Sequence, residues 1–578
     1  MDPQRPERDS NQTLRSQTCL ITGLLIAAAV QTLIIAIPSV PLGISGEWVW
    51  ERLPWPTSLM AAAAQFVPAI AGATALICVA ELGNRLFRQR QTIDGHERRS
   101  RRRIATAAAC LMLFLLVFGM WTWLKTVERC APAPHRHLKS LWVLYDPSSS
   151  GYFYEAAFRI KSTSHFLSSY EERIQEGEVY HVGTHPPGLF VLSRWIVQLC
   201  RNVPLVSAWL YDWIFLHDLK AFHRLESEAQ LEPPLNESQT AALFLLSELT
   251  TLAAALTVVP LFLTLRLYFS VLAAWRATCL WTTVPCLVVF LPKSDVLFTL
   301  TSMATVSLGL TALESSRTML WRLCCAVTGG LVLWCGLMLS LAHLPVLALL
   351  SALVLVRFVR HGMVSRESQL SHSIEGEDNS SPRNVHDIGL RRNSVIRRDL
   401  SVIAVIVATA ATLTLIFSVA TDCNMLSVWR MNLRNHAAFY DVHTRTAWKW
   451  LMINPLELGM SVGLPLALSA LVGLRHVFAA HRRNSTPDFV PPTKNPSQAV
   501  ALTVALLWIS CRNSGESARL WCFLTPWLMV LPACLVGIES NTPDRDVERS
   551  PSINWHVLLL SQMAVCILTS SRVTGFSF

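Results

Sequence analysis

The chain has 578 residues, of which 52% are hydrophobic and 15% are charged, and its formal net charge is +10. Apolar runs of the about 20 residues needed to cross a bilayer recur along it, so the composition excludes a soluble enzyme and predicts a polytopic membrane protein. The cationic residues lie mostly in short segments between these runs rather than on one soluble face, and we therefore expect no nucleic-acid partner.

About thirteen transmembrane helices are predicted, which makes the fold class an all-α polytopic membrane protein. They lie near residues 18–38, 58–82, 104–125, 240–265, 270–291, 294–313, 319–341, 343–360, 399–420, 449–473, 497–511, 519–538 and 555–572. A polar segment precedes the first run, which is long enough to remain as a span, so a cleavable signal peptide is not expected.

Three arginine-rich loops give the direction of these spans. The loops cover residues 85–103, 357–398 and 475–483, and the positive-inside rule places all three in the cytoplasm. One alternating path through the membrane satisfies all three and puts residues 126–239 outside. On this path residues 189–218 start and finish outside, so they are expected to form a juxtamembrane or re-entrant pair of helices.

This topology divides the chain into six regions. They are a cytoplasmic N-terminus (1–17), three N-terminal transmembrane helices (18–125), a large external loop with juxtamembrane helices (126–239), a central group of transmembrane helices (240–360), a disordered cytoplasmic loop (361–398) and C-terminal transmembrane helices with polar external loops (399–578). Disorder is expected in the fifth region because it is rich in Ser, Arg, Glu and Asp and poor in apolar residues.

The external loop carries the first candidate site residues. Asp146 follows an apolar run at the membrane interface, where a partly desolvated carboxylate suits a general base; an ordinary solvated loop aspartate is the alternative. Tyr152 and Glu155 follow at helical spacing as candidate substrate-binding residues. His185 lies in a Thr-His-Pro-Pro turn that Pro187 stiffens. It is a candidate to bind a phosphate, a metal or a sugar hydroxyl, and a structural turn histidine is equally consistent with the pattern.

Two further candidates lie next to later spans on the same side. Asp295, in Pro-Lys-Ser-Asp, opens a span and either caps its helix or orients a substrate. His343 lies between the next two spans.

Two polar loops near the C-terminus complete the candidate set. Arg430, Arg434 and His436 lie in the loop from 421 to 449, where cations and interleaved aromatic residues suit an anionic phosphate and a sugar ring. The aromatic residues are also typical of an interfacial belt. Glu516 and Arg519 are three residues apart, so they either form an ion pair or leave Arg519 to hold a lipid phosphate, which its planar guanidinium matches.

Taken together, these motifs resemble the GT-C class of integral-membrane glycosyltransferases, and within it the family of protein O-mannosyltransferases and the aminoarabinose transferase of lipid A. The likeness covers roughly residues 135–360. It rests on Asp146, the turn 185–188, the Lys-Ser-Asp element 293–295, the Ala-His-Leu-Pro break 342–345 and, further on, the Gly-Glu-x-x-Arg element 515–519. Two departures are that three spans precede the loop and that Pro147, rather than a second carboxylate, follows Asp146. Whether a divalent metal takes part is therefore left open.

The resemblance implies transfer of one sugar from a polyprenyl-phosphate carrier to a hydroxyl of a lipid, glycan or protein acceptor, with inversion, on the outer face of a bacterial-type inner membrane. It implies Asp146 as the base, and we take Arg519, His185 and one of Arg430 or Arg434 as candidates to stabilise the departing phosphate.

Two other classes of function fit parts of the pattern. A transporter or flippase for a lipid-linked or anionic solute predicts charged residues in mid-span, of which Glu248 is the acidic example. The second is a non-catalytic scaffold in cell-envelope assembly.

Overall fold

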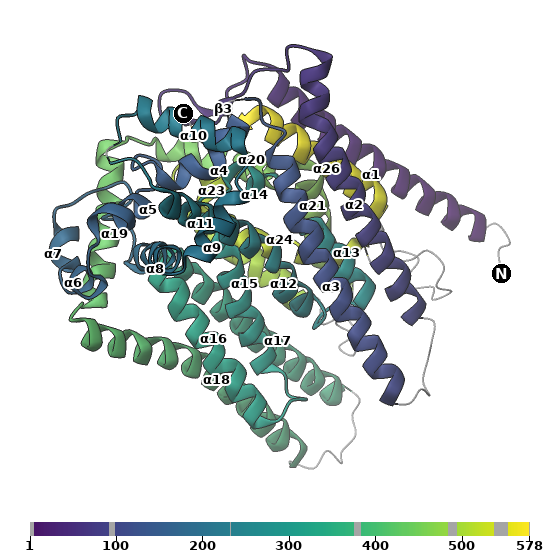
Figure 1. Ribbon diagram of the computed structural model, residues 1–578. Coiled ribbons are helices and arrows are strands. Elements are labelled where there is room, and N and C mark those ends of the chain that lie inside the picture. Colours follow the sequence, from purple (N-terminus) through teal and green to yellow (C-terminus); the bar gives the residue numbers. More distant parts are fainter. Residues whose placement is uncertain are drawn as a thin grey trace.

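The computed structural model describes residues 5–91, 99–133, 135–231, 233–374, 383–483, 494–511, 513–536 and 553–576. These ranges are almost entirely helical, as Figure 1 shows. Their four strands have two residues each: β1 (Gly43–Ile44) pairs with β2 (Trp48–Val49), and β3 (Glu51–Arg52) pairs with β4 (Val573–Thr574), both antiparallel. The prediction of an all-α polytopic membrane protein is confirmed.

Nine helical segments in the described ranges are long and apolar enough to cross a membrane. They are α1 (Arg5–Ala36), α2 (Leu59–Gln91), α3 (Arg99–Glu128), α11 (Glu237–Leu256) with α12 (Val258–Leu265), α13 (Val271–Trp281) with α14 (Pro285–Phe290), α15 (Ser294–Leu313), α16 (Met319–Leu339), η2 (Leu341–His343) with α17 (Leu344–Ile374), and α18 (Arg383–Thr421). All nine coincide with predicted spans.

The remaining predicted spans are less regular than the sequence suggested. The span expected at 449–473 is a pair, α20 (Ala447–Val462) and α21 (Leu464–Arg483), bent by 110°. Two others are shorter apolar segments, α22 (Lys494–Ile509) and the run of η3 (Cys522–Leu524), α24 (Thr525–Leu528) and α25 (Val530–Val536). The last one is α26 (Trp555–Arg572). The pair expected at 189–218 is present as α8 (Gly188–Asn202) and α9 (Pro204–Asp212), bent by 102°.

Short helices build the loops between these segments. They are α4 (His135–Tyr145), α5 (Tyr152–Tyr154), η1 (Glu155–Arg159), α6 (Thr163–Ser168), α7 (Tyr170–Gln175), α10 (Leu216–Glu228), α19 (Met425–Val442) and α23 (Ser517–Leu520). Amphipathicity explains the position of α4: Leu138, Leu141, Trp142 and Tyr145 are buried at the spacing of one helical face. This face joins a hydrophobic cluster that includes Phe222 of α10 and Leu246 of α11, which fixes the C-terminal end of α4.

Part of the region predicted as a disordered loop is helical, because α17 continues to Ile374 and α18 begins at Arg383. Both helices extend beyond their apolar segments, as helix propagation from a packed span allows. Residues 375–382 of that region, and Arg98 of the first arginine-rich loop, lie outside the described residues.

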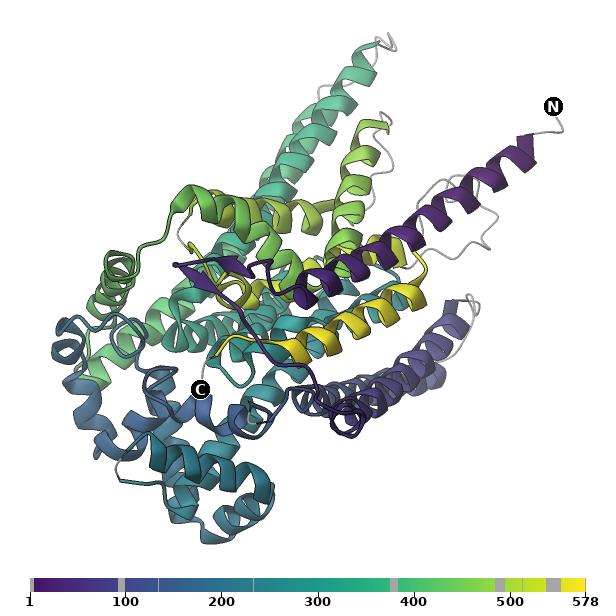
Figure 2. The ribbon, with the colours of Figure 1, turned by 90° about the horizontal axis from the view of Figure 1, so that it is seen from above.

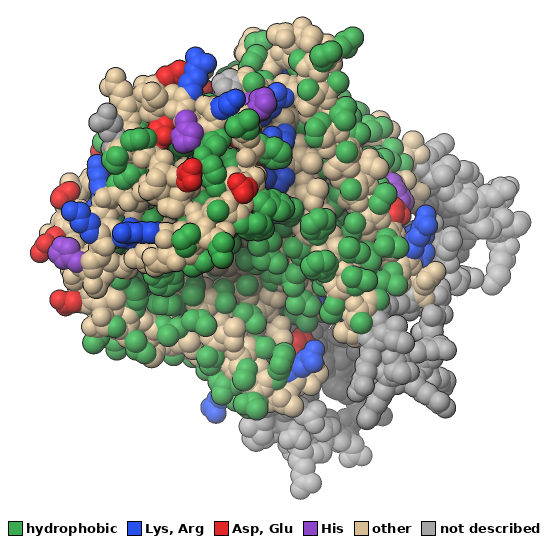
Figure 3. Space-filling view, viewed as in Figure 1, with side chains coloured by type: hydrophobic (Ala, Val, Ile, Leu, Met, Phe, Trp, Pro, Cys, Tyr) green, Lys and Arg blue, Asp and Glu red, His purple; other side chains and the backbone are tan. Residues whose placement is uncertain are grey.

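The two ends of the bundle differ in what they carry. The ends of α2, α3, α17 and α18 that border the arginine-rich loops lie in the lower half of Figure 1, whereas α4, α5, α10 and α23 lie in its upper half. On the face shown in Figure 3, charged side chains gather in the upper part, above a band of hydrophobic side chains. Figure 2, seen from above, shows the segments from residue 126 to residue 239 gathered on one side of the bundle. This arrangement agrees with a multi-pass membrane protein.

Distant segments of the chain are joined inside the bundle. The buried Gln31 of α1 donates through Nε2 to the carbonyl of Met460 (3.0 Å) and to Oγ1 of Thr569 (3.2 Å), and its Oε1 accepts from the N–H of Leu464 (2.7 Å). One amide thus connects α1 with α20, α21 and α26. Arg52 strengthens the same region by donating to the carbonyls of Ile34 (2.8 Å) and Ile35 (3.0 Å) near the end of α1.

Candidate functional site

Asp146 lies directly after α4 and is held by its own turn. Its N–H donates to the carbonyl of Trp142 (2.8 Å), and its carboxylate accepts from the N–H of Ser148 (3.2 Å), the hydroxyl of Ser149 (2.7 Å) and the hydroxyl of Ser148. Gly151, with a φ of 74°, then turns the chain into α5, and this left-handed conformation favours glycine. The carboxylate is half-buried and fixed in direction.

Lys293 connects this turn with the beginning of α15. Its side chain is 3% exposed, and Nζ donates to the carbonyl of Ser149. Burial and then the charge of Arg519 lower the pKa of Lys293 to about 7, although the carboxylate of Asp295 acts in the opposite direction. Asp295 lies in the first turn of α15, two residues after Lys293. A cation and a carboxylate therefore come together where the span begins.

Arg519 is brought to the same place by α23. Glu457 of α20 accepts from the hydroxyl of Ser517 (2.9 Å) and from the N–H groups of Ser517 (3.2 Å) and Ala518 (3.3 Å), which fixes the start of α23. Glu516 has a φ of 57°, an unfavourable value for a residue with a side chain, and forms an ion pair with Arg519. The predicted pair is thus present.

The guanidinium of Arg519 stays charged in this setting. Burial acts to lower its pKa, but the carboxylates of Glu516 and Asp295 outweigh burial and raise this pKa. The Nε of Arg519 is buried and has no hydrogen-bond partner among the described residues.

Two histidines approach from the turn before α8. The carbonyl of His185 accepts from the hydroxyl of Tyr170 (2.7 Å) and from Nδ2 of Asn432 (3.1 Å), so the turn is held by its backbone. Burial and then the charge of Lys293 lower the pKa of His185 to about 3, and the pKa of His181 is well below its usual value for the same reasons. Both imidazoles are therefore neutral near pH 7 and act through hydrogen bonds rather than charge.

Tyr152 lies beside these histidines, with its ring centroid 5.4 Å from that of His185. Burial and then the charge of Asp295 raise the pKa of Tyr152 well above its usual value, so the phenol keeps its proton. Its buried hydroxyl has no hydrogen-bond partner in the described part of the chain. The hydroxyl of Tyr152 and the Nε of Arg519 are therefore both available to donate a hydrogen bond to a ligand.

We call the following residues the polar cluster, because each of them acts on the pKa of at least one other member. They are Asp146, Tyr152, His181, His185, Lys293, Asp295, His436, Glu516 and Arg519. Six elements contribute to it: the turn after α4, α5, the turn before α8, the start of α15, α19 and the α23 region. Of the predicted site residues, Asp146, Tyr152, His185, Asp295, His436, Glu516 and Arg519 are brought together here.

Four predicted site residues are not brought to the polar cluster. Glu155 forms ion pairs with Arg159 (2.7 Å) and with Arg173. His343 is fully buried between helices, with Nε2 2.7 Å from Oγ1 of Thr301.

Arg430 and Arg434 are exposed, on the face of α19 opposite to the one that carries Asn432 and His436. Positions two residues apart lie about 200° apart around a helix, so the two arginines point away from the polar cluster.

Three groups in or beside the polar cluster were not among the predicted site residues. Lys293 belongs to the Lys-Ser-Asp element noted in the sequence, and His181 lies four residues before His185. Arg445 belongs to the polar loop 421–449; it donates to the carbonyl of Glu47, 398 positions away, and lies 4.0 Å from Glu516. No local sequence pattern predicts a contact between residues as far apart as Arg445 and Glu47.

No group of three or more His, Cys, Asp or Glu side chains in the described ranges is arranged to hold a metal ion.

Comparison with known proteins gives limited information. No family model matches the chain, and no curated protein matches it. Among solved structures, the chain is similar to the crystal structure of the oligosaccharyltransferase of Archaeoglobus fulgidus in complex with Zn and sulfate, with 11% identity and a TM-score of 0.35. The match covers 74% of this chain and 53% of that one, so the chain spans about half the length of that protein. The function is therefore inferred from the residues of the polar cluster.

The buried amine of Lys293 gives a prediction about stability. Its pKa is about 7 in the folded protein, below the usual 10.5, so between these values the unfolded chain binds more protons and the free energy of unfolding rises with pH. Lys293→Met removes this dependence. We expect the stability of the variant relative to wild type to be greatest below pH about 7 and to decrease as pH rises. Thermal unfolding in detergent on both sides of this pH measures the difference.

The matched control is Lys220→Met, which changes an exposed lysine on α10. Parallel pH profiles for wild type and Lys293→Met would contradict the burial argument.

Proposed function

We propose that the protein is a membrane glycosyltransferase that moves one sugar from a polyprenyl-phosphate carrier to an acceptor hydroxyl. One observation carries this proposal: segments distant in sequence meet in the polar cluster. They bring together two cations, Lys293 and Arg519, and the carboxylates of the polar cluster. They also bring two buried donors without a partner among the described residues, the Nε of Arg519 and the hydroxyl of Tyr152. The guanidinium of Arg519 and the hydroxyl of Tyr152 suit an anionic phosphate and a sugar hydroxyl respectively. A soluble nucleotide pocket is not required.

The position of the polar cluster relative to the spans suits a lipid-borne donor. Asp295 is the second residue of the membrane-spanning helix α15, so the polar cluster lies where a span begins. A carrier whose tail lies in the bilayer presents its phosphate at that level. The acceptor hydroxyl then approaches from water. We propose that this face lies outside the cytoplasm, in a bacterial-type inner membrane, because the helix ends that border the arginine-rich loops lie toward the opposite end of the bundle.

The proposed reaction is a single displacement with inversion. Asp146 takes the proton of the acceptor hydroxyl as the acceptor oxygen bonds to the anomeric carbon, and the bond from that carbon to the phosphate oxygen breaks. The phosphate leaves with the electron pair and keeps its carrier chain. Arg519 and protonated Lys293 stabilise the charge on this leaving phosphate, while neutral His185 and Tyr152 hold oxygen atoms by hydrogen bonds.

A transporter or flippase is the second candidate, and one observation favours it. The pair α20–α21 bends by 110° at Gly463, which has a φ of 99°, and broken helices of this kind are typical of transporters. Glu248, however, is paired: Nζ of Lys125 lies 2.6 Å and Nε1 of Trp121 3.1 Å from its carboxylate. A paired carboxylate is weaker support for a transport pathway than an unpaired one.

An experiment with reconstituted protein separates the two functions. The purified full-length protein is placed in vesicles and given polyprenyl-phosphate sugars labelled in the sugar, together with lipid, glycan and peptide acceptors. The proposal expects acceptor-dependent release of unlabelled polyprenyl phosphate. Arg430→Gln, which changes an exposed arginine away from the polar cluster, should behave as wild type. Movement of the intact labelled lipid across the vesicle without cleavage of the sugar–phosphate bond would overturn the proposal.

A further inference from the structure

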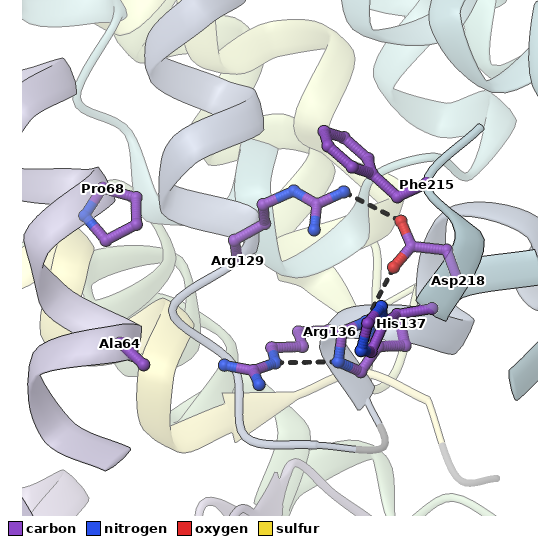
Figure 4. Close-up of a pocket in the computed structure, with 8 residues that line it drawn as sticks. Ala64, Pro68, Arg129, Arg136, His137, Phe215 and Asp218 are labelled. Atoms are coloured by element: carbon purple, nitrogen blue, oxygen red, sulfur yellow. Dashed lines mark hydrogen bonds and ion pairs between the residues drawn. The ribbon is translucent and has the colours of Figure 1, made fainter. Parts of the chain in front are cut away.

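A cavity of about 280 Å³ lies between the start of α2, the end of α3, the start of α4 and the start of α10 (Figure 4). We call it the α2–α10 cavity; its lining residues are Ala64, Pro68, Arg129, Arg136, His137, Phe215, His217 and Asp218. None of them belongs to the polar cluster. The α2–α10 cavity therefore needs an explanation of its own.

A chain of hydrogen bonds links the polar residues of this cavity. Arg129 donates to Oδ2 of the buried Asp218 (2.8 Å), and Nδ1 of His137 lies 2.7 Å from the other oxygen of that carboxylate. Nε of Arg136 donates to Nε2 of His137 (3.1 Å). In the tautomer that satisfies both contacts, His137 donates from Nδ1 to Asp218 and accepts at Nε2 from Arg136.

These hydrogen bonds leave the cavity with an excess of positive charge. Asp218 is the carboxylate among the lining residues, and Arg129 and His137 already occupy both of its oxygens. Arg136 has no acidic partner among the described residues. In Figure 4 the terminal nitrogens of Arg136 point toward Ala64 on α2, into the open part of the cavity. The ring of exposed His217 lies beside that of His137, with centroids 5.9 Å apart, and adds a further donor. An anion with several oxygen atoms fits these donors.

The other wall of the cavity is apolar and includes a helix that is long and apolar enough to span a membrane. Ala64 and Pro68 belong to the membrane-spanning helix α2, whose first residues Leu59 and Met60 are 92% and 82% exposed. Phe215 lies under the guanidinium of Arg129, 4.0 Å from it. Next to Phe215, Trp213 is exposed, as aromatic residues at a membrane interface commonly are. A ligand here meets cations on one side and hydrocarbon on the other.

We propose that the α2–α10 cavity binds the phosphate headgroup of an anionic membrane phospholipid, with the acyl chains lying along α2. A lipid headgroup and a free inorganic phosphate both offer a phosphate anion to these donors. The apolar wall favours the lipid, because a free phosphate gains nothing from contact with Ala64, Pro68 and Phe215. Arg136 is the main contact, since it is the guanidinium without a carboxylate. This site does not depend on the function of the polar cluster.

Native mass spectrometry of the full-length protein tests the proposal. The protein, in a neutral detergent, is incubated with phosphatidylglycerol or with phosphatidylcholine, and retained lipid is counted. Wild type should retain phosphatidylglycerol in preference. Arg136→Gln should weaken this retention by about tenfold, the loss of one charge-assisted hydrogen bond, whereas Arg136→Lys should lose less. The matched control is Arg201→Gln, which removes an exposed arginine of α8 and should leave retention unchanged.

A second variant keeps the test valid if Arg136→Gln folds poorly. His217→Gln changes an exposed side chain and should also reduce retention of phosphatidylglycerol. An excess of inorganic phosphate should not displace the lipid; displacement would show that the cavity takes a soluble anion and would overturn the lipid assignment. Equal retention of phosphatidylglycerol by wild type, Arg136→Gln and His217→Gln would overturn the site altogether.

Discussion

Arg519→Gln is expected to lower the turnover of a polyprenyl-phosphate sugar by about 100- to 1,000-fold, the usual cost of removing a preorganised group that stabilises developing charge. The guanidinium is charged, held by Glu516 and provided with an unpaired Nε, so its loss removes both charge and donors at the leaving phosphate. Steady-state kinetics of purified protein with a labelled donor measure the effect, which should lie in kcat more than in KM.

Two comparisons make this result specific. Arg519→Lys keeps the charge but not the planar fork, so its turnover should fall between wild type and Arg519→Gln. Arg434→Gln removes an exposed arginine that points away from the polar cluster and should turn over as wild type does. Unchanged turnover in Arg519→Gln would show that Arg519 does not stabilise the leaving phosphate.

Asp146→Asn is expected to reduce kcat by about 100- to 10,000-fold, because the amide cannot accept the proton of the acceptor hydroxyl. The variant keeps the size of the side chain, and the hydroxyls of Ser148 and Ser149 still find an oxygen acceptor. Donor binding should therefore persist, and single-turnover assays with saturating donor should show slow chemistry rather than weak binding.

Asp295→Asn is the informative partner of this variant, since it removes a second carboxylate near Lys293 and Arg519 and leaves Glu516 in place. We expect it to raise KM for the donor more than it lowers kcat, because Asp295 orients the cations. The reverse pattern, with active Asp146→Asn and inactive Asp295→Asn, would assign the base to Asp295.

The fold class could be predicted from the sequence because hydrophobic length is a local signal. The nine long spans were located from apolar runs alone, and the bent pair α8–α9 followed from the need to return to the same side. Where the prediction was less accurate, the helices are bent or short, as in α20–α21 and in the segment from Cys522 to Val536. Hydropathy counts apolar residues but does not register a change in direction.

The candidate site was predicted only in part, because the sequence shows where a residue lies along a span but not which way its side chain points. Residues next to a span end, such as Asp295, could be assigned to one level of the membrane, and several of them do meet. Arg430 and Arg434 were predicted as site residues, but both lie on the exposed face of α19. The sequence did not show which face of that amphipathic helix packs inward. His343 is buried against α16, where Gly336 leaves room for its ring, and only three-dimensional packing could show this.

The amide of Gln31 has a consequence for biogenesis. Its partner Thr569 is 538 positions further along the chain, so α1 reaches the bilayer long before that partner has been synthesised. An unpaired amide is unfavourable in hydrocarbon. The amide gains its bonds to Met460 and Leu464 only after α20 and α21 have been made, and its bond to Thr569 only after α26. A chain that stalls before α20 therefore leaves this amide without all three partners, so unfinished protein carries an unpaired polar group in the membrane.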